Sequence, residues 1–170
     1  IEDIDKGRCR PEYEEAIYED LAWLGLEWEE PVRRQSEHFA DYERGLKHLR
    51  EMGLVYPCFA TRKEIQDAIV ASGIPLQNWP TDPDGAPLYP GICKDMPKER
   101  LNELMWEGRT YAWRLDTEKA KHEAERINGG PITFNEEGES ARGDHGRLAI
   151  EPELFGDVVI ARKDVPTSYH

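Results

Sequence analysis

Few side chains in this sequence combine a reactive type with a spacing that could support chemistry. Cys58 and Cys93 flank a proline-rich stretch that also holds Tyr89. Two thiolates and a phenolate could supply three of the four tetrahedral ligands that structural zinc usually takes. The residues offer no evident fourth ligand, so two separate buried thiols are the alternative interpretation.

A second candidate is the acidic group at the start of the chain, Glu2, Asp3 and Asp5. An EF-hand calcium loop needs a further acidic or amide ligand where Gly7 stands, so we reject that site. The residues by themselves then indicate a solvated acidic turn. The sequence also lacks a Walker loop and the GxGxxG, HExxH and GxSxG motifs, which leaves the common phosphate, zinc-protease and serine-hydrolase sites without support.

Helices are the first elements that must position these side chains. Apolar residues recur at helical spacing after Pro11, with glutamates on the remaining face. Ser36 is a suitable N-cap for a helix that stops at Gly53, and Thr61 with Glu64 forms a capping box that starts another. Helices are expected over 11–26, 36–53, 61–73, 97–106 and 117–127.

Strands and loops fill the intervals. Alternating apolar residues predict a half-buried strand over 111–115, and a compact β-branched run predicts another over 157–162. Five prolines make 74–96 an irregular excursion. Shorter strands are expected over 55–59 and 132–134, with a polar loop over 135–145. The chain therefore mixes α and β structure.

Composition limits the class of protein. The chain has 170 residues, 38% hydrophobic and 34% charged, which is typical of a soluble globular domain. Because no apolar run approaches the length of a membrane span, we expect a cytoplasmic protein without a membrane partner. A net charge of −13 argues against a surface covered with basic residues that bind nucleic acid. A local basic track would still serve an RNA-binding enzyme.

Seven short phrases follow one another from end to end of the chain. They are 1–8 (IEDIDKGR), 20–28 (DLAWLGLEW), 34–37 (RQSE) with Tyr42, 56–61 (YPCFAT), 89–93 (YPGIC), 156–162 (GDVVIAR) and 166–170 (PTSYH). This succession resembles the catalytic domain of the glutamyl-tRNA synthetase family of class I aminoacyl-tRNA synthetases. Ile4 and the ending RKDVPTSYH bring the sequence nearer to the short paralogue that acts on the queuosine base of tRNA(Asp).

The resemblance implies a Rossmann-type α/β catalytic domain, present here in part, with an inserted α+β region that contacts the tRNA acceptor stem. The expected division is 1–57 for the first part of the Rossmann domain, 58–155 for the insertion and 156–170 for the return. The family joins L-glutamate to ATP, used with Mg²⁺, as glutamyl adenylate and then transfers the glutamyl group to tRNA. The resemblance also favours a monomer.

Two glutamate-binding residues carry over from the family pattern. Glu2 matches the acidic residue that binds the amino group of glutamate, and Tyr169 matches the tyrosine that closes the same pocket. A carboxylate suits the first role because it accepts charge-assisted hydrogen bonds from an ammonium group. Arg8 matches the arginine of the opening phrase, but an ion pair with Asp3 or Asp5 is the alternative role for it.

The sequence departs from the family pattern in two places. Zinc-bearing members show Cys-x-Cys followed by Tyr and Cys, whereas here Ala60 replaces the second cysteine, so Cys58, Tyr89 and Cys93 form a degenerate set and we expect no zinc. The two ATP motifs of the family, and its arginine for the side-chain carboxylate of glutamate, fall outside these 170 residues. We therefore expect no catalytic residue in this stretch and no activity from it alone.

Four functions are consistent with these observations. The first is transfer of glutamate to the queuosine base of tRNA(Asp), and the second is charging of the 3′ end of tRNA(Glu). The third is a non-catalytic, RNA-binding paralogue, which degenerate ATP motifs in the flanks would indicate. The fourth, a free-standing metal-binding or interaction domain, leaves the ordered phrases unexplained.

Overall fold

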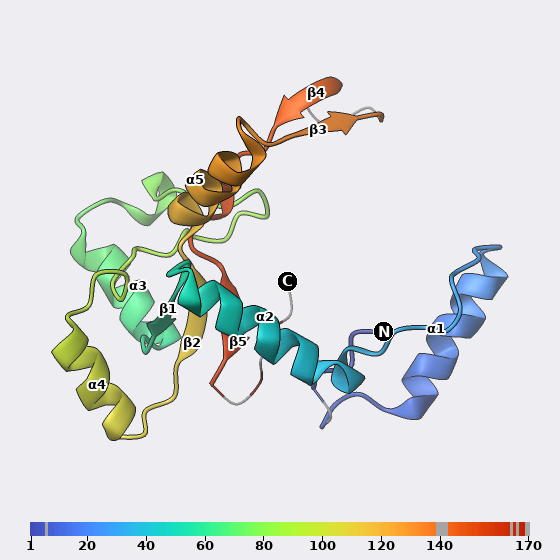
Figure 1. Cartoon of the computed structure of the whole chain (residues 1–170), viewed down its shortest axis with the longest axis horizontal. Coiled ribbons are helices and arrows are strands. Elements are labelled where there is room, and N and C mark those ends of the chain that lie inside the picture. The colour runs from blue at the N-terminus through green and yellow to red at the C-terminus, as the bar shows by residue number, and fades with distance from the viewer. Residues whose placement is uncertain (6, 139–142, 164, 166, 169–170) are drawn as a thin grey trace.

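A computed structural model describes residues 1–5, 7–138, 143–163, 165 and 167–168 (Figure 1). These residues form a mixture of helices and short strands, as the sequence predicts. The helices are α1 (Pro11–Trp23), α2 (Phe39–Glu51), α3 (Arg62–Ala71), α4 (Lys98–Trp106) and α5 (Thr117–Asn128), and the strands are β1 (Val55–Cys58), β2 (Ala112–Leu115), β3 (Thr133–Glu136), β4 (Gly146–Ala149) and β5 (Val159–Arg162). Short 3₁₀ turns lie at Gln35–Glu37, Leu76–Asn78 and Pro152–Phe155.

The central sheet joins segments that lie far apart in the sequence. Its strand order is β1-β2-β5, and both pairs are antiparallel. Trp113 stands opposite Pro57 on one side and Ala161 on the other. The sheet thus links all three parts of the expected domain division, since β1 straddles the boundary at 57, β2 lies in the expected insertion and β5 in the expected return. The division itself stays a prediction.

The core lies around this sheet. Leu104 of α4, Ile69 of α3 and Trp113 of β2 are buried. The predicted capping box at the start of α3 is confirmed, because the Thr61 hydroxyl accepts from the Glu64 amide and the Glu64 carboxylate accepts from the Thr61 amide. The core therefore combines buried residues of the sheet, of two short helices and of the segments that join them. Its buried apolar members are Leu54, Cys58, Phe59, Ile69, Cys93, Leu104, Trp113 and Ala161.

The predicted helix start at Ser36 is wrong. Residues Gln35–Glu37 form a separate 3₁₀ turn, and α2 begins at Phe39 with His38 as its N-cap. The Ser36 hydroxyl is engaged elsewhere, because it donates to the Asp3 carboxylate. A residue type that suits a cap therefore serves a tertiary contact, which the local sequence could not reveal.

The predicted polar loop over 135–145 is wrong in part. Its first two residues extend β3, which pairs antiparallel with β4 from Thr133 opposite Ala149 to Glu136 opposite Gly146. Strand β4 carries glycine and arginine rather than β-branched residues, so its sequence gave little strand signal. A short hairpin therefore projects beyond α5, as Figure 1 shows at the top of the molecule.

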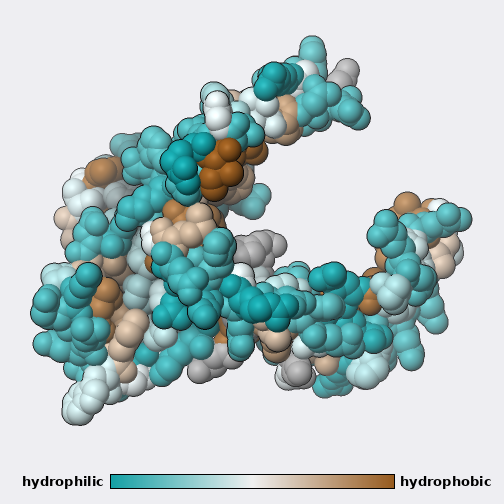
Figure 2. Space-filling model, in the orientation of Figure 1, coloured by the Kyte–Doolittle hydropathy of each residue, from teal (hydrophilic) through white to brown (hydrophobic). Residues whose placement is uncertain are grey.

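Helix α1 stands apart from the core. It contains no buried residue, and the Trp23 side chain at its end is 85% exposed. In Figure 2 a wide concavity separates the arm that carries α1 from the β3–β4 hairpin, and this face is mostly hydrophilic. None of the helices in the described part of the chain is long and apolar enough to cross a membrane.

Candidate functional site

The opening segment and α1 enclose a cleft of about 680 Å³. Its walls combine carboxylates and guanidinium groups, so the cleft suits a small ligand that carries both signs of charge. The predicted residue Glu2 lies on its wall. The lining residues are Ile1, Glu2, Asp3, Asp5, Arg8, Cys9, Arg10, Pro11, Tyr13, Glu14, Ile17 and Arg34.

Contacts with the 33–36 segment fix the opening segment in place. The Asp3 carboxylate accepts from the Ser36 amide at 2.8 Å and from the Ser36 hydroxyl at 2.6 Å. The Gln35 amide donates to the Ile1 carbonyl at 3.0 Å. Burial by itself raises the pKa of Asp3, but the hydrogen bonds from Ser36 hold that pKa below its usual value. Asp3 is therefore a structural carboxylate that holds the backbone beside Glu2.

An ion pair ties α1 to the same segment. The Arg34 guanidinium donates to both carboxylate oxygens of Glu14, at 2.6–3.0 Å. The Tyr18 hydroxyl donates to Glu14 at 2.8 Å, and the Tyr18 ring stacks on Trp28. The hydrogen bonds from Arg34 and then from Tyr18 lower the pKa of Glu14. Both walls of the cleft are thus held by side chains that are already paired.

Glu2 differs from these paired carboxylates. Its side chain is exposed to the cleft, and among the described residues no hydrogen bond or ion pair engages its carboxylate. Arg8 takes the alternative role considered above, because its Nε donates to the Asp5 carboxylate at 2.6 Å. The Glu2 carboxylate is therefore the acidic group of the cleft that is available to a ligand.

Tyr169, the second predicted glutamate-binding residue, lies outside the described residues. Its described neighbours Thr167 and Ser168 line a second cleft, of about 230 Å³, together with Ile4 and Asp5. Thr167 and Ser168 therefore lie beside the opening segment, although more than 150 residues separate them from it in the sequence. How the Tyr169 side chain is placed stays a prediction.

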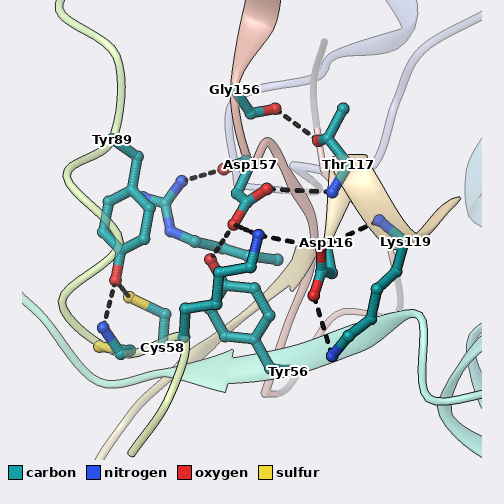
Figure 3. Close-up of polar contacts among 11 residues, drawn as sticks. Tyr56, Cys58, Tyr89, Asp116, Thr117, Lys119, Gly156 and Asp157 are labelled. Carbon is teal, nitrogen blue, oxygen red and sulfur yellow. Dashed lines mark hydrogen bonds and ion pairs between the residues drawn. The ribbon is translucent and has the colours of Figure 1, made fainter. Parts of the chain in front are cut away.

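The cysteine and tyrosine residues of the degenerate zinc set do come together. The Cys58 sulfur and the Tyr89 hydroxyl oxygen are 3.3 Å apart, and the Cys93 amide donates to the same hydroxyl at 2.8 Å (Figure 3). The Arg114 guanidinium lies over the Tyr89 ring, 3.8 Å from its centroid. The hydrogen bond from Cys93, followed by that from Tyr89, lowers the pKa of Cys58, whereas the hydrogen bond to Cys58 and burial raise the pKa of Cys93.

This donor set does not fit a structural zinc ion. Zinc of this kind takes four ligands, and cysteine thiolates with histidine are its usual donors. Here two thiols and a phenol converge, and Ala60 provides a methyl group where a third thiol would stand. Within the described ranges no group of three His, Cys, Asp or Glu side chains could hold a metal ion. We therefore assign no role to zinc.

A polar network beside the cysteines was not foreseen from the sequence. The Asp157 carboxylate accepts from the Tyr56 hydroxyl at 2.6 Å and from the Thr117 amide at 3.0 Å (Figure 3). The Thr117 hydroxyl donates to the Gly156 carbonyl, and Arg114 donates to the Asp157 carbonyl, each at 2.6 Å. The network joins the strand segment before β5 to β1, β2 and the start of α5.

Asp116 is the buried anion of this network, with 2% of its surface exposed. Lys94 lies 2.9 Å from Asp116 and 3.2 Å from Asp157, and Lys119 lies 3.1 Å from Asp116. Burial alone would raise the pKa of Asp116, but hydrogen bonds from Lys94 and Lys119 hold it below its usual value. The position of Asp116 just before a predicted helix was the available signal, since aspartate is a favoured N-cap.

Comparison with known proteins connects these features. The family described as tRNA synthetases class I (E and Q), catalytic domain, matches residues 1–170. A glutamyl-Q tRNA(Asp) synthetase from Rhodobacter capsulatus is 38% identical over the whole chain, which spans 56% of that relative. A glutamate–tRNA ligase from Aquifex aeolicus is 32% identical over the whole chain, which spans 31% of it. The chain thus corresponds to a part of each relative.

The fold agrees with the same family. The crystal structure of a glutamate–tRNA synthetase from Elizabethkingia anophelis superposes with a TM-score of 0.64 at 22% identity, covering 99% of this chain and 32% of that one. The predicted fold class, an α/β class I catalytic domain present in part, is therefore confirmed. Together, the match along all 170 residues and the shared fold establish that this chain belongs to the family of class I tRNA synthetases for glutamate and glutamine.

Proposed function

We propose that the protein acts in the cytoplasm to activate L-glutamate with ATP and to transfer the glutamyl group to the queuosine base of tRNA(Asp). The observation that carries this proposal is the identity of 38%, along the whole chain, with a glutamyl-Q tRNA(Asp) synthetase. A second relative of that name, from Nitratidesulfovibrio vulgaris, is 44% identical over 123 residues. The chain spans 56% and 36% of these two relatives, so the activity is proposed for the protein as a whole.

The 680 Å³ cleft supports the amino-acid part of the proposal. The Glu2 carboxylate is exposed there and accepts hydrogen bonds from the ammonium group of glutamate, with Tyr169 closing the pocket. Asp3 and Glu14 are already paired, so they keep the walls in place without competing for the ligand. ATP, with Mg²⁺, reacts at its α-phosphate with the glutamate carboxylate, and pyrophosphate leaves as glutamyl adenylate forms.

Charging of the 3′ end of tRNA(Glu) is the second candidate. It is favoured by the match of the Aquifex glutamate–tRNA ligase to the whole chain, at 32% identity. Activation of glutamate is common to both functions, so the cleft does not discriminate between them. They differ in the group that accepts the glutamyl residue.

The deciding experiment measures ATP-dependent attachment of labelled glutamate by the longest form of the protein that its gene encodes. The acceptors are tRNA(Asp) with queuosine, tRNA(Asp) transcript without it, and tRNA(Glu). A further sample of queuosine-containing tRNA(Asp) lacks its 3′-terminal nucleotides. We expect attachment to both queuosine-containing samples and to neither of the others. Attachment to tRNA(Glu) that depends on an intact 3′ end would overturn the proposal in favour of the second candidate.

A further inference from the structure

The two buried cysteines are neighbours in space. Cys58 ends β1 and Cys93 lies near the end of the proline-rich excursion, and each is 3% exposed. Tyr89 brings them together, because the Cys58 sulfur lies 3.3 Å from the Tyr89 hydroxyl oxygen and the Cys93 amide donates to the same hydroxyl at 2.8 Å. The third cysteine, Cys9, lies in the opening segment and lines a different cleft. The chain thus contains one adjacent dithiol and one separate thiol.

The surroundings of Cys58 favour its thiolate form. Its interactions with the Cys93 thiol and then with the Tyr89 hydroxyl, with smaller contributions from the Ala60 amide and Arg114, hold the pKa of Cys58 well below its usual value against the effect of burial. The Nε of Arg114 is buried and has no conventional hydrogen-bond partner within the described structure. A nearby guanidinium and several donors stabilise a sulfur anion, and a thiolate is the reactive form of cysteine in oxidation and exchange.

A cleft opens onto Cys93, one member of this pair. It has a volume of about 210 Å³, and both Ala60 and Cys93 line it. The small side chain of Ala60 leaves this side of the pair open, where a larger residue would fill part of the space. The cleft therefore gives a small solute a route to Cys93, although this residue is almost fully buried.

We propose that Cys58 and Cys93 form a reversible dithiol–disulfide couple that small hydroperoxides oxidise. One thiolate attacks a peroxide oxygen, the O–O bond breaks, and the departing hydroxide takes a proton to become water, which leaves a sulfenic acid. The second thiol then attacks that sulfur, and the S–S bond forms as a second water leaves. The pair loses two electrons, and hydrogen peroxide is reduced to two molecules of water. A dithiol reductant reverses the change.

The bond would tie the excursion to the sheet. In the dithiol form, Tyr89 holds the excursion against β1 through hydrogen bonds to both cysteines. Lys94 also holds it, through ion pairs with Asp116 and Asp157. A covalent link at the same point keeps the same neighbours and removes the freedom of the excursion to detach. This inference does not depend on which tRNA the protein uses.

The test uses the longest form of the protein that its gene encodes, treated with hydrogen peroxide under native conditions. Free thiols are then blocked in denaturant, the sample is digested without reduction, and disulfide-linked peptides are identified by mass spectrometry. We expect a linked peptide pair that contains Cys58 and Cys93, loss of alkylation at both residues, and recovery of both after dithiothreitol. The matched control is Cys9→Ser, which keeps the pair and should give the same link.

The test also contains the results that would overturn the proposal. The first is that Cys58 and Cys93 can still be alkylated at a peroxide concentration that oxidises Cys9. The second is sulfinic acid at either residue without any linked peptide. The third is stoichiometric zinc in the purified protein. Because the link is mapped in the unsubstituted protein, the result stands even if Cys58→Ser or Cys93→Ser fails to fold.

Discussion

At the scale of single residues, the three acidic side chains of the opening segment differ in what engages them. Glu2 presents a carboxylate that no described side chain engages, whereas the neighbouring Asp3 and Asp5 are each committed to a partner. Three acidic residues in five positions therefore have different roles, set by what lies across from them in the fold. Position 60 is a similar case, because Ala60 stands where zinc-bearing members of the family carry a cysteine, and we expect this one residue to govern metal binding.

Replacing Glu2 tests the binding role proposed for it. Glu2→Gln keeps the size of the side chain and removes the charge, so the KM for glutamate should rise about tenfold to a hundredfold, the loss expected for one charge-assisted hydrogen bond. Glutamate-dependent pyrophosphate exchange by the longest form of the protein measures this change. The matched control is Glu15→Gln, which removes an exposed charge on α1 outside the cleft and should leave the KM unchanged. Equal effects of the two substitutions would contradict the role of Glu2.

Restoring a thiol at position 60 tests our account of the degenerate zinc set. Ala60→Cys would place a third thiol beside Cys58 and Cys93, with the Tyr89 phenol as the fourth donor. We expect the variant to be purified with about one zinc ion per chain, since three thiolates and one oxygen can complete a tetrahedron. Elemental analysis by mass spectrometry provides the measurement, and Ala71→Cys, which adds an exposed thiol on α3, provides the control. Equal zinc content in the two variants would show that position 60 does not govern metal binding.

At the scale of elements, local sequence signals predicted the structure correctly where the contacts that form an element lie within that element. The Thr61–Glu64 box closes within four residues, so it could be recognised directly. Ser36 has the same chemical suitability as a cap, but Asp3 competes for its hydroxyl from 33 residues away. The Asp157 network likewise depends on residues that lie far apart in the sequence. Four separate segments meet there, so no single segment could predict it.

Among the acidic residues of that network, Asp116 should be the one whose substitution destabilises the fold most. Asp116→Asn removes a buried charge that Lys94 and Lys119 both engage, and we expect a loss of about 2 kcal/mol in the free energy of unfolding. Urea unfolding followed by circular dichroism measures the loss. Asp67→Asn, an exposed substitution on α3, is the control and should change stability very little. A loss of similar size in both variants would contradict the importance of the network.

Asp116→Asn should also change how the stability of the fold depends on pH in the acidic range. Because the pKa of Asp116 is lowered in the folded protein, its charge stabilises the fold above the unfolded value of 3.8, and this contribution disappears as the pH falls through the folded value. The stability difference between the unsubstituted protein and Asp116→Asn should therefore be constant near neutral pH and shrink below pH 3.8. A difference that grows on acidification would reverse the sign that we assign.

At the scale of the whole molecule, the 170 residues combine a small packed centre with an extended arm. Helix α1 has no buried residue and exposes Tyr13, Ile17 and Trp23, while the buried residues gather around the central sheet. The overall family could be predicted from the sequence because seven phrases occur in order. The unequal burial of the elements could not be predicted from the sequence, because it depends on how far each element lies from the sheet.

These 170 residues, expressed alone, should not catalyse glutamate-dependent pyrophosphate exchange. They carry the candidate carboxylate for the amino group of glutamate, but neither family motif for the phosphates of ATP, and stabilising the charge on those phosphates is the main source of rate enhancement in such reactions. The comparison is with the longest form of the protein that its gene encodes, which should be active under identical conditions. Exchange by the 170 residues above the rate of a blank sample would overturn this expectation.

The strand order β1-β2-β5 also has a consequence for synthesis on the ribosome. Strand β2 can pair with β1 as soon as both have emerged, but its other edge stays open until β5, more than forty residues later, is made. Until then the nascent chain lacks Asp157, so Tyr56 and Lys94 have not yet met a common partner. A ribosome that stalls between β2 and β5 would display an unpaired strand edge to other chains, the kind of surface that chaperones must cover.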